Sequence, residues 1–363
     1  PTMKWLYTLL WSMLQWLPIR WEVCTKLQQK AWDHLEEQHK HERDTTKNTA
    51  LPIPTVDFQR NRQHLSSHLR ETFGKDWRKR PLLLRGIWTS EELNANNTNA
   101  TRKLSLQGLL NEELEIPYFD DATNKILSPN NRAPVKDIVK NMTLGIPHKI
   151  GSQLLVDEYP ALLNEVAPLD VMTELFGDFF SEDCLKGSGP FNLFPALTTV
   201  PVFIANSKPK MSEHVGCSEK SRLLSDDETE EETARTQPFT ALHCEPIGNV
   251  AVQLSGRKEW SLIPPEYSML IKPSLSPDGR AFFASNSNSY INVPTYNAIT
   301  SAGDAIWVPS WTWHSVNYIP SEDIAIGASL FHFRAWDFIT NNALFAVLVT
   351  PAIIKELLGL NTQ

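Results

Sequence analysis

The last third of the chain reads as one short strand after another, and this pattern constrains the fold more than any other feature. Short apolar runs alternate with turn residues such as Ser255-Gly256 and Pro277-Asp-Gly279. The expected strands are residues 249–254, 258–263, 290–293, 305–308 and 324–333. Evenly spaced short strands are typical of an antiparallel barrel or jelly roll. We therefore expect a mainly β fold to which helices are added.

The remaining chain divides around this block. Further strands are expected at residues 80–86 and 201–205, and one or two helices at residues 160–180, with Asp170 as a helix start. Residues 343–358 have apolar spacing typical of a helix, with Pro351 inside it, and are too short to cross a bilayer. The expected domains are a leader with an exposed helix at 1–50, the main domain at 51–340, and a packed or homodimerising C-terminal helix at 341–363.

Three side chains in the strand-rich block have the spacing of a metal site. His243 and Glu245 lie two residues apart, so on an extended segment they point to the same face. His314 must come from a strand that lies alongside. Two imidazoles and one carboxylate on one face are the ligands of a mononuclear Fe(II) centre with open coordination positions. On spacing alone, unrelated histidines are the simpler alternative.

Two longer runs support the metal interpretation. The first contains Thr240, His243, Glu245, Asn249, Gly256-Arg-Lys258-Glu-Trp260 and Pro264-Pro265. The second begins at Gly303-Asp304 and continues through Pro309, Trp311 and Trp313 to His314. Together they resemble the JmjC and cupin-like family of Fe(II)- and 2-oxoglutarate-dependent oxygenases. Within it they are similar to the protein hydroxylases that include the asparaginyl hydroxylase acting on hypoxia-inducible factor.

The resemblance extends over residues 80–334 and implies a double-stranded β-helix (jelly-roll, cupin-like) core with an N-terminal α/β portion. It implies that His243, Glu245 and His314 bind Fe(II), with Glu245 in place of the commoner Asp. It also implies that Thr240 and Lys258 bind the far carboxylate of 2-oxoglutarate, which needs a cation and a hydroxyl donor.

Weaker implications concern other residues. Asn249 is expected to contact the cosubstrate or orient a ligand, and Ser329 to be a second polar residue nearby. The alternatives are an exposed turn for Lys258 and a structural amide for Asn249. Packing is the simpler role for three tryptophans and for a histidine on the last strand: Trp307, Trp311, Trp313 and His332.

The activity implied by the resemblance is hydroxylation of a protein or peptide side chain with O2. The alternatives are an N-methyl-lysine demethylase and a catalytically silent lumenal scaffold. The net charge of −8 argues against a protein that binds nucleic acid by neutralising phosphates. Residues 207–237 are acidic and poor in large apolar side chains, which indicates a mobile insertion, or else a calcium site.

The N-terminal residues 5–19 are mostly apolar, which suits a signal peptide or a signal anchor that associates with membranes. A helix packed on the domain is the alternative. Three glycosylation sequons, at Asn96, Asn99 and Asn141, favour the secretory pathway, in the endoplasmic reticulum lumen or on its membrane. The cytoplasm and the nucleus are the alternative locations.

Overall fold

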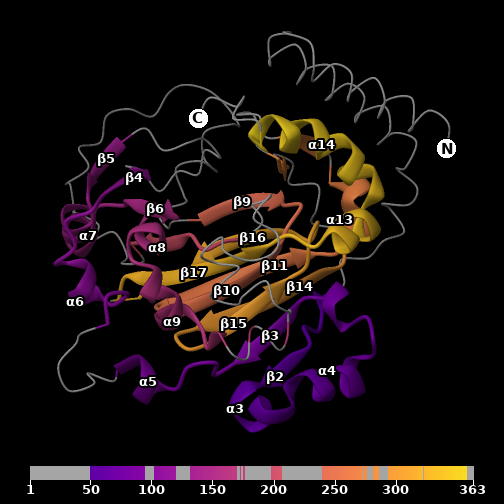
Figure 1. The fold of residues 1–363 in the computed structure, drawn as a ribbon, viewed down its shortest axis with the longest axis horizontal. Coiled ribbons are helices and arrows are strands. Elements are labelled where there is room, and N and C mark those ends of the chain that lie inside the picture. Colours follow the sequence, from indigo (N-terminus) through magenta and orange to yellow (C-terminus); the bar gives the residue numbers. More distant parts are fainter. Residues whose placement is uncertain are drawn as a thin grey trace, which may run out of the picture.

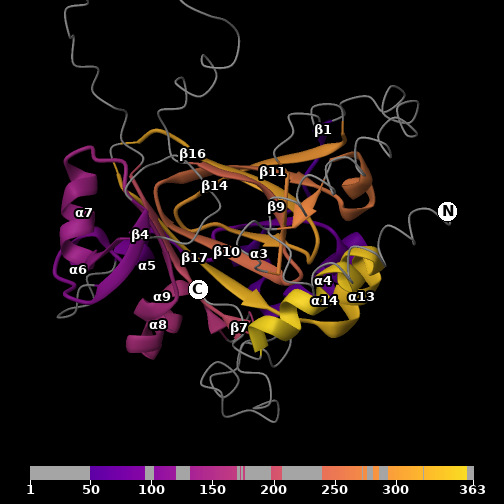
Figure 2. The ribbon, with the colours of Figure 1, turned by 90° about the horizontal axis from the view of Figure 1, so that it is seen from above.

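The computed structural model describes residues 50–94, 102–119, 131–169, 172, 175, 198–206, 239–271, 273–275, 281–285, 293–321 and 323–357. In these residues nearly every strand belongs to one of two sheets that lie face to face (Figures 1 and 2). This is the jelly-roll core that the strand pattern predicts.

The smaller sheet contains β9, the strand that carries His243. Its strands lie in the order β1 (Ala50–Leu51), β14 (Thr295–Ser301), β11 (Arg257–Ile263), β16 (Trp313–Tyr318), β9 (Phe239–Cys244), β13 (Phe283–Ala284) and β12 (Ser274–Leu275). All of these neighbours pair antiparallel except β1 with β14. Strands far apart in sequence therefore become neighbours.

The larger sheet runs in the order β2 (Thr55–Asp57), β3 (Leu82–Arg85), β15 (Ala305–Val308), β10 (Gly248–Ser255), β17 (Ala325–His332), β8 (Val202–Ala205), β6 (Lys149–Ser152), β4 (Glu115–Phe119) and β5 (Asn131–Pro134). A short strand, β7 (Thr198–Thr199), also pairs with β17. The central strand β10 is buried on both faces, and its buried residues include polar Asn249 and Gln253 as well as apolar side chains.

Short helices cover the outside of this barrel (Figure 1). Those before the strand-rich block are α3 (Phe58–Asn61), α4 (Leu65–Phe73), α5 (Ser90–Asn94), α6 (Leu106–Leu109), α7 (Val135–Thr143), α8 (Leu154–Glu158) and α9 (Leu163–Val166). Two follow it, α13 (Ala335–Asn341) and α14 (Ala343–Leu357). Single 3-10 turns occupy Arg62–His64, Trp77–Lys79 and Pro160–Leu162, and a longer one occupies Pro265–Leu270.

Three apolar clusters hold these layers together. The largest lies between the outer face of the larger sheet and helices α4, α7 and α8, and includes Val250 and Val252 of β10. A second, which includes Ala251, Trp260 and Leu262, lies between the two sheets inside the barrel. A third joins β9 and β13 to α13 and α14. Alternate residues of β10 thus serve different cores, as the pleat of a strand requires.

Most of the expected strands are present. β3, β8, β10, β11, β15 and β17 lie within one or two residues of their predicted ranges. Of the strand expected at 290–293, residues 290–292 lie outside the described part of the chain, and Val293 lies in a bend before β14. Residues 160–166 form the predicted helical segment, but Asp170 lies outside the description.

The C-terminal helix is confirmed as α14, which contains Pro351 and buries Phe345 and Val349. Its exposed Val347 and Ile354 are compatible with a homodimer through this helix, which stays a prediction. No helix in the described part of the chain is both long and apolar enough to span a bilayer.

The apolar leader, the acidic insertion and the first two sequons lie outside the described residues. The third sequon lies in the last turn of α7. There the side chain of Asn141 is partly buried, and its amide nitrogen is 3.5 Å from Nε2 of His148. The secretory location stays a prediction.

Candidate metal centre

The pairing of β9 with β16 brings the two predicted histidine ligands together. His243 and His314 are direct register partners, and their ring centroids are 4.2 Å apart. The register shifts next to this pair, so that Thr240 lies opposite Val316. Three steps along β9 therefore correspond to two along β16, as in a β-bulge. The irregularity lets Thr240 and His243 face the same side, although an odd spacing normally separates them.

The three predicted ligands form a compact group. One ligand atom each from His243, Glu245 and His314 lie within 4.8 Å of one another, and Nε2 of His243 is 4.0 Å from Oε1 of Glu245. His314 is buried, while the side chains of His243 and Glu245 are partly accessible. The group is therefore partly accessible to solvent at His243 and Glu245.

Backbone carbonyls orient both imidazole rings through their Nδ1 atoms. Nδ1 of His243 lies 2.8 Å from the carbonyl oxygen of Ala241, and Nδ1 of His314 lies 3.1 Å from that of Thr312. A carbonyl only accepts, so each Nδ1 carries a proton and Nε2 is the nitrogen of each ring left to bind a metal ion. Burial lowers the pKa of His314 to about 4, which keeps this ring neutral at physiological pH. Neutral imidazole with a free Nε2 is the form that binds metal ions.

Trp311 holds the turn before His314 in place through two hydrogen bonds. This residue has φ of 65°, a left-handed conformation that is rare for a bulky side chain. Its backbone N–H donates to the carbonyl of Glu245 at 2.8 Å, and its indole N–H donates to the carbonyl of Phe338 at 2.8 Å. Trp311 thus connects the segment of the carboxylate ligand to the segment of the second histidine, and both to α13.

The Gly-Asp pair of the second motif has a structural role. Gly303 has φ of 92°, and a Cβ there would lie 2.4 Å from the carbonyl oxygen of Trp88. Buried Asp304 accepts hydrogen bonds from the backbone N–H groups of Gly86 and Ser301, and it pairs with Arg85. These contacts hold the β14–β15 turn against β3.

Lys258 lies deep in the barrel, towards the end away from the metal ligands. It faces inward, because it lies two residues before Trp260 of the interior cluster on β11, and it is 5% exposed. Its ammonium lies 5.7 Å from the ring centroid of Phe203 and 5.2 Å from that of Tyr318. Among the described residues no carboxylate pairs with it. The alternative of an exposed turn lysine is therefore wrong.

Burial and a like charge both act on this lysine. Desolvation, with a smaller repulsion from Lys149, lowers the pKa of Lys258 to about 7. Lys149 comes from β6 of the larger sheet, and burial lowers its pKa to about 8. Its Nζ donates to Oγ1 of Thr240 at 3.1 Å and to the carbonyl of Phe239 at 3.3 Å. Sequence reasoning missed Lys149, because it lies 91 residues before Thr240 and belongs to no motif.

The other predicted cosubstrate residues also lie inside the barrel. Ser329 pairs with Ala251 of the interior cluster, and Asn249 pairs with Val308 of the same cluster. Both polar side chains are buried, and Oδ1 of Asn249 has no hydrogen-bond partner among the described residues. A buried acceptor without a partner is costly in a purely structural amide, so this position suits contact with a ligand.

The packing roles predicted for the tryptophans are confirmed. Trp307, Trp311 and Trp313 are almost fully buried, and the indole N–H of Trp313 donates to Oγ of Ser268 at 2.9 Å. His332 is fully buried and stacks on Trp307 with ring centroids 5.1 Å apart. It belongs to the outer face of the larger sheet and is separate from the metal ligands.

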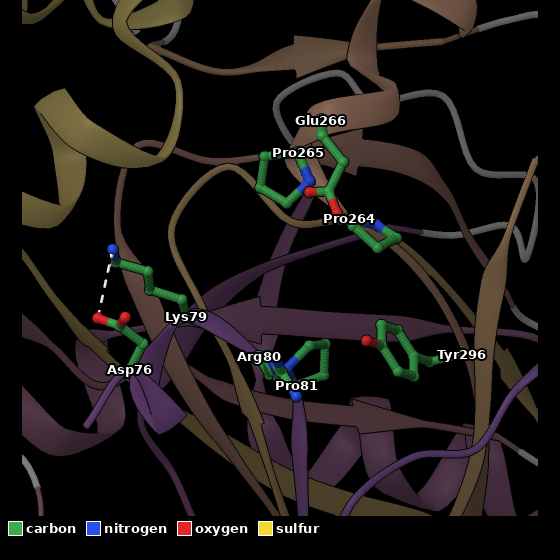
Figure 3. Close-up of a pocket in the computed structure, with 8 residues that line it drawn as sticks. All are labelled: Asp76, Lys79, Arg80, Pro81, Pro264, Pro265, Glu266 and Tyr296. Atoms are coloured by element: carbon green, nitrogen blue, oxygen red, sulfur yellow. Dashed lines mark ion pairs between the residues drawn. The ribbon is translucent and has the colours of Figure 1, made fainter. Parts of the chain in front are cut away.

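A pocket of about 400 Å³ opens at the barrel rim (Figure 3). Tyr296 lines it and also packs against the interior cluster. Tyr296 and His314 both pair with Leu262, so the pocket lies at the metal end of the sheet. The other residues around it include charges of both signs and three prolines: Asp76, Lys79, Arg80, Pro81, Pro264, Pro265 and Glu266.

The donor set and its surroundings fit a mononuclear iron centre. Two imidazoles and one carboxylate on one face leave the remaining positions of an octahedral ion open, as in Fe(II) oxygenases. Leu262, the register partner of His314, lies four positions after Lys258 on β11. This spacing corresponds to about 13 Å along the strand. A lysine side chain and a five-carbon dicarboxylate can fill this length together.

Comparisons with known proteins agree with this architecture. No curated protein matches the chain. A family model described as a cupin-like domain matches residues 21–332. That family includes Fe(II)- and 2-oxoglutarate-dependent oxygenases and demethylases, and its JmjC-type members typically bind Fe(II). With a match over most of its length, a two-sheet core and a His-Glu-His group on that core, the chain belongs to the cupin-like domain family.

Proposed function

We propose that this protein is an Fe(II)- and 2-oxoglutarate-dependent oxygenase that hydroxylates a side chain of a protein or peptide. His243, Glu245 and His314 would hold the iron. Lys258 and Thr240 would hold the far carboxylate of 2-oxoglutarate. Asn249 and Ser329, inside the same barrel, would contact the cosubstrate between these two ends.

The observation that carries the proposal is the buried ammonium of Lys258. A charged group inside a barrel is costly unless it is paired, and no described carboxylate pairs with Lys258. A catalytically silent scaffold gains nothing from this cost. In an enzyme, an anionic cosubstrate bound beside Lys258 would offset the unfavourable free energy of the buried charge. The lysine therefore favours an oxygenase over a scaffold.

The chemistry and the residues divide the work. When bound, Fe(II) and 2-oxoglutarate supply oxidation by O2, in which 2-oxoglutarate becomes succinate and CO2 and a substrate C–H bond becomes C–OH. The carbonyls of Ala241 and Thr312 hold the Nδ1 side of each ring, which leaves each Nε2 to face the metal position, and burial keeps His314 neutral. Trp260, buried in the barrel beside His314 with ring centroids 6.3 Å apart, keeps water from this part of the interior.

The rim pocket supports a polypeptide substrate. Its prolines and charges of both signs, shown in Figure 3, would offer contacts for a polypeptide chain. Lys79 is paired with Asp76 at 3.4 Å, while Glu266 and Arg80 also line the pocket. The pocket thus suits a chain with both acidic and basic residues, and the sequence of that chain is not specified by these contacts.

The test is turnover with defined components. The purified protein is incubated with Fe(II), ascorbate, O2 and 2-oxoglutarate, and succinate is measured by mass spectrometry with and without a peptide library. We expect slow succinate formation alone and faster formation with a substrate peptide. His314→Ala should abolish both, while exposed Lys140→Met should change neither. Wild-type protein that binds Co(II) but neither binds nor consumes 2-oxoglutarate would refute the proposal.

The product separates hydroxylation from its nearest alternative. A hydroxylated peptide gains one oxygen atom, whereas a demethylated lysine loses a methyl group and releases formaldehyde. A peptide library with and without N-methyl-lysine distinguishes the two in one experiment. Formaldehyde release only with the methylated peptides would assign the protein to the demethylases instead.

A further inference from the structure

The end of the barrel away from the metal ligands carries two lysines from opposite sheets. Lys149 pairs in register with Ala205, and Lys258 pairs with Tyr318. Ala205 and Tyr318 belong to one small buried cluster. The two strands therefore deliver their ammonium groups to the same region, close enough for Lys149 to contribute to the lowered pKa of Lys258.

The contact between Lys149 and Thr240 also sets the direction of a hydroxyl proton. The ammonium of Lys149 has no lone pair and donates to Oγ1 of Thr240 at 3.1 Å. Thr240 must then direct its own proton away from Lys149. Thr240 faces the barrel interior, because its register partner Val316 belongs to the interior cluster. Lys149 thus orients Thr240 as a donor towards whatever binds inside.

We infer that Lys149 is a second cationic binding residue for the far carboxylate of 2-oxoglutarate, and that it sets the selectivity of the site for dicarboxylates. This inference rests on the proposed function. One carboxylate oxygen accepts from Lys258 and the other from Lys149, while Thr240 donates as well. Two like charges inside a barrel repel each other, and an anion between them converts that repulsion into attraction.

Selectivity follows from the same arrangement. A 2-oxo acid without the far carboxylate, such as 2-oxobutyrate, can reach the metal ligands but has no second carboxylate to accept from Lys258 and Lys149. The structure therefore favours oxo acids that end in a second carboxylate. Removing the charge of Lys149 should reduce the preference for 2-oxoglutarate and leave binding of the monoacid almost unchanged.

Lys149→Gln is the sharpest variant, because its amide can still donate to Thr240 and Phe239 and keep the two sheets joined. Binding of 2-oxoglutarate and of 2-oxobutyrate to the Co(II)-loaded protein is measured by calorimetry. We expect about a 10- to 100-fold loss of 2-oxoglutarate affinity, the loss of one charge-assisted hydrogen bond. The affinities for 2-oxobutyrate and Co(II) should change less than about threefold. Lys149→Arg, which keeps the charge, and exposed Lys140→Met are the controls, and both should retain selectivity.

Two outcomes would overturn the inference while the proposed function stands. If Lys149→Gln binds 2-oxoglutarate as tightly as the wild type, Lys149 has only a structural role in joining the two sheets. An equal loss of affinity for 2-oxoglutarate and 2-oxobutyrate would indicate a distorted pocket. A wild-type protein that binds Co(II) but no 2-oxoglutarate would overturn both the inference and the proposed function. Melting temperatures of all variants identify any that fail to fold. If Lys149→Gln does not fold, Lys149→Arg is compared with the wild type instead. A loss of the preference of Lys149→Arg for 2-oxoglutarate over 2-oxobutyrate would also count against the inference.

Discussion

Replacing Lys258 by methionine should make the ligand-free protein more stable while it abolishes cosubstrate binding. Burial and the charge of Lys149 lower the pKa of Lys258 from 10.5 to about 7. That difference corresponds to about 5 kcal/mol of unfavourable free energy in the charged folded state. Methionine fills a similar volume without charge, so about 5 kcal/mol is the upper limit of the gain in unfolding free energy.

The dependence on pH gives this prediction its sign. Below pH 7, Lys258 is charged in both the folded and the unfolded chain, so its full cost is present. Between pH 7 and 10.5 only the unfolded chain holds the proton, so the stability of the wild type rises with pH. The advantage of Lys258→Met should therefore shrink from at most about 5 kcal/mol at pH 6 to about 2 kcal/mol at pH 9.

Urea unfolding of the ligand-free wild type, Lys258→Met and the exposed control Lys140→Met at pH 6 and pH 9 measures these differences. Calorimetry with 2-oxoglutarate measures the loss of binding in the same preparations. A variant that is less stable than the wild type at pH 6 would refute the reasoning. So would an advantage that does not depend on pH, because the gain would then come from packing alone.

Three further predictions address binding, the metal and the fold. The affinity for 2-oxoglutarate should be constant below pH 7 and fall about tenfold per pH unit above it, since the anion binds charged Lys258; calorimetry from pH 6 to 8.5 checks this. Glu245→Gln should lose most bound Co(II) on dialysis and Glu245→Asp should retain it, and equal retention by both would exclude the carboxylate as a ligand. Asp304→Ala should lower the unfolding free energy by about 3 kcal/mol, because the N–H groups of Gly86 and Ser301 lose their acceptor, and an unchanged melting temperature would contradict this.

The sequence predicts the strands of this fold well where an apolar run is continuous, as in β15, which is buried along its whole length. It predicts them less well where only one face is buried. β14 alternates exposed Asn297 and Ile299 with buried Ala298 and Thr300, a pattern with few apolar residues in a row. Alternation with period two is the signal that reveals such a strand.

The three candidate metal ligands were predictable because they lie in long ordered motifs, but the second lysine was not. His243 and His314 become neighbours through a strand pairing that the motifs imply. Lys149 reaches Thr240 from β6, which lies in the other sheet and precedes the motif strands in the chain. Only the packing of the two sheets brings that side chain into the barrel, and no local pattern in the sequence reports this packing.

The register between β9 and β16 has a consequence for how the protein matures. The ladder sets His243 opposite His314, and the carbonyls of Ala241 and Thr312 orient the two rings. Backbone pairing therefore organises the centre, in contrast to small zinc domains, whose folding depends on the metal. On the proposed function, the metal-free chain would therefore fold to the same structure and bind iron after folding, and a metal-free preparation should melt cooperatively.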